Sequence, residues 1–124
     1  MEIKIDILKV SSNKIYAGIH YRTRKKLKDD YLLLTKKLFK SLKSVKGKVN
    51  LDFTFYFAGR TLDSSNCSFM AKMLEDCLVT YGVLANDTIE FVGKVSLEAI
   101  KIKDKKINDY CIIKVSNPVI PNIV

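Results

Sequence analysis

The chain is poor in the residue types that build several classes of protein. It has no Trp, one His, three Cys, five Gly and two Pro among its 124 residues. The scarcity of Gly and Pro leaves no room for a flexible linker, and one His with three widely separated Cys cannot form a CxxC-type zinc site. We therefore expect Cys67, Cys77 and Cys111 to be small buried residues in a reducing compartment.

Long hydrophobic runs are also missing. No apolar stretch reaches the ~18 residues that span a bilayer. The first residues alternate Ile3, Ile5 and Ile7 with charged residues, which is typical of a strand and not of a signal peptide. Hydrophobic residues make up 48% and charged residues 28% of the chain, an ordinary globular composition. We expect a single cytoplasmic domain over residues 1–124, with no membrane partner.

Negative charge is scarce in the first half of the chain. Residues 1–60 hold 15 Lys and Arg against 5 Asp and Glu, whereas residues 61–124 hold 7 against 8. The net charge of +9 therefore comes from the first half, and most carboxylates lie in the second. A basic surface beside an acidic cluster is expected of an enzyme that holds a polyanion and cuts it with metal ions. A nucleic-acid binder with an ordinary acidic face has the same distribution, so both interpretations stay open.

The hydrophobic pattern predicts four strands and two amphipathic helices. The strands are expected at residues 2–10, 49–57, 89–102 and 108–116, the helices at about 22–44 and 66–81, and an aromatic loop at 14–21. Gly93 predicts a bulge in the third strand, and Ser64 or Ser65 is a candidate cap of the second helix. The order of elements predicts an α+β fold, in which a small mixed sheet packs against the two helices.

Polar residues gather in and around the second predicted helix. Lys72, Glu75 and Asp76 share one helix face, while Asp63 and Asp87 stand on the flanking turns, where catalytic groups are commonly displayed. Phosphodiester hydrolysis needs carboxylates that gather Mg²⁺, and a nearby lysine offsets developing negative charge. The alternative is a solvated helix face, with the two aspartates in capping or turn roles.

Two geometric conditions apply to this group. Helical side chains lean toward the helix N-terminus, so Lys72 is expected to approach Asp63. Asp87 lies several residues past the helix end. It can share a site with Asp63 only if residues 82–87 run back beside the helix, if the helix is shorter than predicted, or if a second subunit supplies one aspartate.

The first helix begins with a basic run, Arg22-Thr23-Arg24-Lys25-Lys26, and aromatic residues precede or accompany it. Basic side chains contact phosphates, and Tyr16, His20 and Tyr21 can stack on exposed bases, so the segment favours nucleic-acid binding. A merely solvated helix face and a membrane-surface helix are the alternatives.

Taken in order, these pieces resemble the RusA-type Holliday junction resolvases. Asp63-x-x-Asn66, then Lys72 and Asp76 on a helix, then residues 82–87 (GVLAND) are similar to the core motif of that family. Residues 13–25 resemble its N-terminal aromatic and basic segment, and Gly59-Arg60 ends the strand before the motif. The similarity covers about residues 10–115.

The resemblance implies a homodimeric DNA endonuclease that cuts four-way junctions in recombination, repair or phage DNA processing. It implies Asp63, Lys72 and Asp87 as catalytic residues, and Asp63, Asp87 and Asp76 as ligands of Mg²⁺ or Mn²⁺. The residues implied in DNA binding are Lys14, Tyr16, His20, Arg22, Arg24, Lys25, Arg60 and Asn66.

Two positions depart from the family pattern. Ser65 stands where the second aspartate of the motif belongs, and Lys72 comes three residues later than usual. Asn66, Asp76 or Glu90 would have to replace the missing carboxylate. Ser65 therefore supports a second hypothesis, a nucleic-acid-binding protein of the same fold without cleavage. A basic structural protein with no nucleic-acid role is the third.

Overall fold

The alternation of apolar and polar residues over Val49–Phe57 makes this segment, β2, a strand with one buried face. Its odd-numbered side chains are buried and its even-numbered ones partly exposed. β2 pairs in parallel with β3 (Val92–Lys101) and antiparallel with β4 (Tyr110–Ser116), and β4 pairs antiparallel with β1 (Glu2–Asp6). The order β1-β4-β2-β3 leaves β1 and β3 at the two edges of the sheet.

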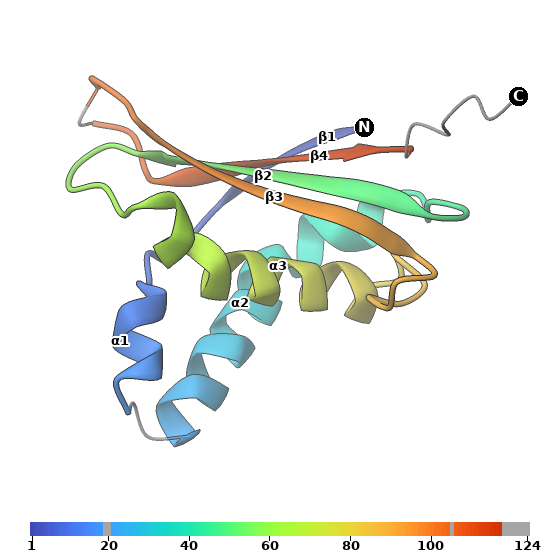
Figure 1. The fold of residues 1–124 in the computed structure, drawn as a ribbon, viewed down its shortest axis with the longest axis horizontal. Helices are drawn as coiled ribbons and strands as arrows, with labels where there is room; N and C mark the ends of the chain where they lie inside the picture. Colours follow the sequence, from blue (N-terminus) through green and yellow to red (C-terminus); the bar gives the residue numbers. More distant parts are fainter. Residues whose placement is uncertain (19–20, 105, 118–124) are drawn as a thin grey trace, which may run out of the picture.

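The helices cover one face of this sheet (Figure 1). They are α1 (Ser12–Tyr16), α2 (Tyr21–Ser41) and α3 (Ser68–Thr80), the last preceded by a 3-10 turn, η1 (Ser64–Cys67). This computed structural model describes residues 1–18, 21–104 and 106–117. In that part of the chain the opposite face of the sheet carries no helix. The predicted α+β class, a mixed sheet with amphipathic helices packed against it, is confirmed.

The core lies between the sheet and the helices. The buried side chains of β2 pack there with Tyr31 and Phe39 of α2 and with Met70 and Leu74 of α3. The buried line of α2 is Tyr31, Thr35 and Phe39, whereas Leu27, Leu34 and Leu38 of the same helix are only partly buried. Thr35 is tolerated in this line because its hydroxyl donates a 2.8 Å hydrogen bond to the Tyr31 carbonyl.

The N-terminal region differs from the sequence prediction. β1 ends at Asp6, so residues 7–10 are a linker and not the end of a strand. Tyr31 is the physical reason, because its buried hydroxyl accepts a hydrogen bond from the Leu8 N–H and donates one to the Leu8 carbonyl. Residues 12–16 form α1, where a loop was predicted, and Ile15 of this single turn is buried in the core.

The start of α3 also differs. Neither Ser64 nor Ser65 caps this helix, because both lie within η1. Ser12 does so from a distant part of the chain: its buried Oγ accepts a 2.9 Å hydrogen bond from the Phe69 N–H and lies 2.8 Å from Ser68 Oγ. The predicted irregularity near Gly93 is confirmed, since the register of β2 against β3 shifts between Val49 and Leu51.

Among the residues that the structure describes, no helix combines the length and the apolar character needed to cross a membrane.

Candidate functional site

α3 and the loop that follows it bring four charged side chains together. The Lys72 Nζ lies 2.6 Å from Asp87 Oδ2, 3.3 Å from Asp76 Oδ1 and 3.6 Å from Glu75 Oε1. Lys72, Glu75 and Asp76 share one face of α3, as their spacing predicted. Asp87 comes from the loop between α3 and β3. We call these four residues the Lys72 cluster.

Asp87 reaches this cluster because the chain folds back on α3. Gly82 adopts a positive φ of 77°, which ends the helix and reverses the chain. Val83 and Leu84 are buried, and their N–H groups both bond to the Leu78 carbonyl, at 2.9 and 3.2 Å. The Asp87 N–H then donates to Asn86 Oδ1 at 2.8 Å. Residues 82–87 thus run back beside α3, as the first of the three conditions above required, but they bring Asp87 to Lys72 and not to Asp63.

The electrostatics of the Lys72 cluster are unbalanced. Three carboxylates surround one ammonium, so the formal charge of the group is negative. Burial raises the pKa of Glu75, with Lys72 acting in the opposite direction. The hydrogen bond from Lys72 lowers the pKa of Asp87, and the same bond raises the pKa of Lys72. Lys72 therefore stays an ammonium at neutral pH.

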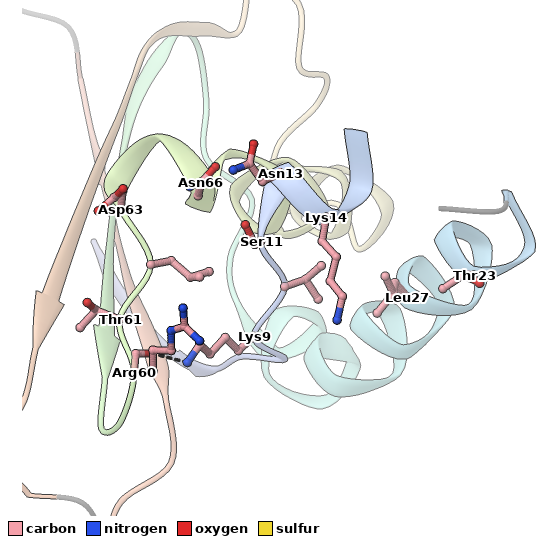
Figure 2. Close-up of a pocket in the computed structure, with 12 residues that line it drawn as sticks. Lys9, Ser11, Asn13, Lys14, Thr23, Leu27, Arg60, Thr61, Asp63 and Asn66 are labelled. Atoms are coloured by element: carbon pink, nitrogen blue, oxygen red, sulfur yellow. Dashed lines mark hydrogen bonds between the residues drawn. The ribbon is translucent and has the colours of Figure 1, made fainter. Parts of the chain in front are cut away.

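A cavity of about 880 Å³ lies between the linker that follows β1, the first half of α2 and the turn that precedes η1 (Figure 2). Three cations line it, Lys9, Lys14 and Arg60, against one carboxylate, Asp63. Lys9 donates a hydrogen bond to the Arg60 carbonyl oxygen and so joins two walls of the cavity. The other lining residues are Val10, Ser11, Asn13, Thr23, Leu27, Thr61, Leu62 and Asn66. We call this space the basic cavity.

The structure divides the predicted catalytic residues between these two places. Lys72, Asp76 and Asp87 meet in the Lys72 cluster, whereas Asp63 is an exposed residue of the basic cavity. Lys72 does not pair with Asp63, contrary to the prediction from the lean of helical side chains. Its ammonium is drawn to the carboxylates on its C-terminal side, and the extra turn η1 separates Asp63 from α3.

Three of the predicted DNA-binding residues, Lys14, Arg60 and Asn66, line the basic cavity. Arg24 donates a 3.3 Å hydrogen bond to the Ile15 carbonyl, which ties the start of α2 to α1. Arg22 and Lys25 are exposed on the first turns of α2, Tyr16 is the last residue of α1, and His20 lies outside the described residues.

Sequence reasoning missed Lys9, which is the residue that links the two walls of the cavity. It was assigned to a strand, and only the end of the alternating pattern after Ile7 could have indicated a loop there. Neither a protein-family model nor a curated protein sequence matches this chain. The resemblance to the resolvases therefore rests on the sequence motifs alone.

The Lys72 cluster has the types of side chain that bind a divalent cation, but their positions do not form a metal site. Asp76 and Asp87 offer carboxylate oxygens, the donors that Mg²⁺ prefers, and these oxygens already converge on the positive charge of Lys72. Yet the described residues include no group of three or more His, Cys, Asp or Glu side chains placed to hold a metal ion. Asp63, the third ligand expected from the resemblance, stands in the basic cavity.

Proposed function

We propose that this protein is a structure-specific DNA endonuclease similar to the RusA-type resolvases, with four-way junctions as its substrate. The observation that carries this proposal is the meeting of Lys72 with Asp76 of α3 and Asp87 of the following loop. Carboxylates from separate elements around one lysine supply the two kinds of group that phosphodiester hydrolysis requires, metal-binding oxygens and a positive charge.

The basic cavity and the exposed start of α2 would hold the DNA. Lys9, Lys14 and Arg60 give the cavity a positive charge, and Asn66 adds a neutral hydrogen-bonding group. Most of this affinity would come from phosphate contacts, which release counterions. Binding is therefore expected to fall steeply between ~50 and ~200 mM salt. A binding isotherm that does not change with salt would exclude a phosphate-holding role.

In the proposed reaction Lys72 offsets the negative charge that develops on the scissile phosphate. Its raised pKa suits this role, because the ammonium does not lose its proton at neutral pH. Asp76 and Asp87 would hold Mg²⁺ or Mn²⁺ in the Lys72 cluster, without Asp63, which lies in the basic cavity. When bound, such an ion activates water and neutralises charge at phosphorus.

The test is cleavage of a synthetic four-way junction with Mg²⁺ or Mn²⁺. We expect the wild type to nick it and Asp87→Asn to bind it with equal affinity but to nick at least about 100-fold more slowly. Asp29→Asn is the matched control, since it makes the same change on an exposed residue of α2 and should leave cleavage intact. Arg60→Ala should weaken binding.

A nucleic-acid-binding protein without cleavage is the second candidate. Two observations favour it: Ser65 replaces the second aspartate of the motif, and Asp63 does not join the Lys72 cluster. The same assay separates the two functions. If the wild type and Asp87→Asn bind the junction alike and neither nicks it with either metal, the protein is a binder and the endonuclease proposal is wrong.

We also propose that the protein works as a homodimer in the cytoplasm. Two sites related by a two-fold axis would match the symmetry of a four-way junction. Cys67, Cys77 and Cys111 are buried and free, which suits a reducing compartment.

A further inference from the structure

The edge strand β3 has an unpaired side. β2 pairs with it along its length on one side, and on the other side the described residues contribute only one hydrogen bond, from the Ala99 N–H to Ser64 Oγ at 3.2 Å. That bond covers the C-terminal part of the edge. Residues 94–98 remain open, and a row of unpaired backbone groups is a template for pairing with another strand.

The hydrogen bonds around β3 show which backbone groups face outward. The Lys94 N–H turns toward β2, where it donates to Asn50 Oδ1 at 2.9 Å, and the Ala99 N–H turns away from β2. Because backbone groups alternate in direction along a strand, the N–H and C=O groups of Val95 and Leu97 face outward. An added strand would bond to these two residues.

The side chains of residues 94–98 in one copy are complementary to those of the same residues in a second, antiparallel copy. Val95 and Leu97 stand opposite the buried Leu51 and Phe53 of β2, so they lie on the face of the sheet that the helices cover. Val95 is nevertheless 45% exposed. Lys94, Ser96 and Glu98 alternate with them and lie on the opposite face of the sheet, which the described helices do not cover and which we call the bare face. A positive and a negative residue thus stand at equal distances on either side of Ser96.

We propose that a second copy of this chain pairs antiparallel with β3 about a two-fold axis at Ser96. In this register Lys94 of each copy faces Glu98 of the other, and Val95 faces Leu97. Opposite charges and apolar side chains directly across from each other both stabilise antiparallel pairs. The contact is isologous, so it closes at two copies and does not grow into a fibre.

This pairing builds on the homodimer proposed above and specifies its interface. It joins the two sheets into one continuous sheet and places the helices of both copies, with both Lys72 clusters and both basic cavities, on the same side. It does not depend on cleavage. A monomer that nicks junctions would refute the interface alone, and a dimer that does not nick would refute the enzyme alone.

The test is sedimentation equilibrium of the full chain and its variants over a wide range of protein concentration. We expect a monomer–dimer equilibrium for the wild type. Lys94→Glu places like charges opposite each other twice per dimer, and we expect its dimer to dissociate on the order of tenfold more readily. Glu98→Lys should act alike, and the double variant Lys94→Glu with Glu98→Lys should regain the wild-type dissociation constant.

Two further variants keep the proposal falsifiable. Val95→Pro removes an outward N–H, which an edge strand tolerates, so it should abolish the dimer and leave the circular dichroism spectrum unchanged. Lys101→Glu makes the same charge change as Lys94→Glu but lies outside residues 94–98, so it should leave dimerisation unaltered. A monomeric wild type would overturn the proposal. So would a dimer that is insensitive to Lys94→Glu and Val95→Pro, or a double variant that is not rescued.

Discussion

Lys72 holds the Lys72 cluster together, so its removal is the sharpest test of the electrostatics described above. Lys72→Met keeps the aliphatic stem and removes the ammonium. The three carboxylates then lose their shared cation and repel one another, and Glu75 among them is a buried residue. We therefore expect Lys72→Met to destabilise the folded protein at neutral pH.

The magnitude follows from the exposure of the pairs. An exposed ion pair contributes about 0.2–1 kcal/mol. The Lys72 side chain is 52% exposed and makes three such pairs, so solvent screening limits the total. The expected loss in the free energy of unfolding at pH 7 is about 1–2 kcal/mol. Lys26→Met is the control, because Lys26 makes a single pair with Asp30 on an exposed helix face and should lose only about 0.3–0.5 kcal/mol.

The loss should also depend on pH in a defined direction. Lys72 lowers the pKa of Asp87 in the folded state. The stability that this pair contributes is therefore present above the unfolded pKa of about 3.9 and disappears as the pH falls through the folded value. The difference between wild type and Lys72→Met should be largest at neutral pH and shrink below about pH 4.

Urea unfolding of the three proteins between pH 3 and pH 7 measures both effects. Similar losses for Lys72→Met and Lys26→Met at pH 7 would show that the cluster has no energetic importance beyond one surface pair. A difference between wild type and Lys72→Met that stays constant down to pH 3 would show that the carboxylates are not the partners that matter.

Three further predictions concern buried groups. Tyr31→Phe should lower the free energy of unfolding by about 1–3 kcal/mol, because it leaves the N–H and C=O of Leu8 without their partner. The hydroxyl of Tyr56 makes no such contact with the described residues, so Tyr56→Phe should change the free energy of unfolding little in the same urea titration. Glu75→Gln should gain thermal stability relative to the wild type as the pH rises above about 4.3, since burial raises the pKa of the native carboxyl and penalises its charged form; a constant difference in melting temperature across pH would contradict this. The three buried thiols should react with a thiol reagent only after denaturation, because each is at most 1% exposed and desolvation raises their pKa values, that of Cys67 to about 11; rapid labelling of the native protein would contradict their burial.

The regular elements could be predicted where the hydrophobic period is strong. The strict alternation over Val49–Phe57 fixed that strand at its observed bounds, because only one register places five large apolar side chains on the same face. The hydrophobic pattern over residues 66–81 likewise predicted α3, although the helix starts at Ser68 after a 3-10 turn and not at Asn66. The first and last residues of a helix or strand depend on individual contacts, which a periodic pattern does not predict.

Contacts between distant segments were beyond the reach of the sequence. Ser12 caps α3, and Tyr31 holds the linker at Leu8, across separations of 57 and 23 residues. Both residues look ordinary in their local context, a serine in a polar break and a tyrosine in a helix stripe. The helix α1 could not be predicted either, since a helix of five residues has too few positions to display a hydrophobic period.

The candidate site, like the fold, could be predicted only in part. The shared face of Lys72, Glu75 and Asp76 follows from helical spacing alone. The arrival of Asp87 depends on Gly82 and on the burial of Val83 and Leu84, which were visible in the sequence but not decisive, so three routes stayed open. The place of Asp63 in the basic cavity depends on the turn η1, which no pattern predicted.

The bare face of the sheet differs in charge from the rest of the molecule. Strand alternation sets Glu2, Asp6, Asp52 and Glu98 on that face against Lys4, Lys94 and Lys114, so it is slightly acidic in a protein whose net charge is +9. The surplus of positive charge is therefore carried by the helices and by the segments that connect the strands. A polyanion that approaches the protein is attracted more strongly to those parts than to the bare face. This uneven distribution would orient the protein relative to a polyanion before the two are in contact.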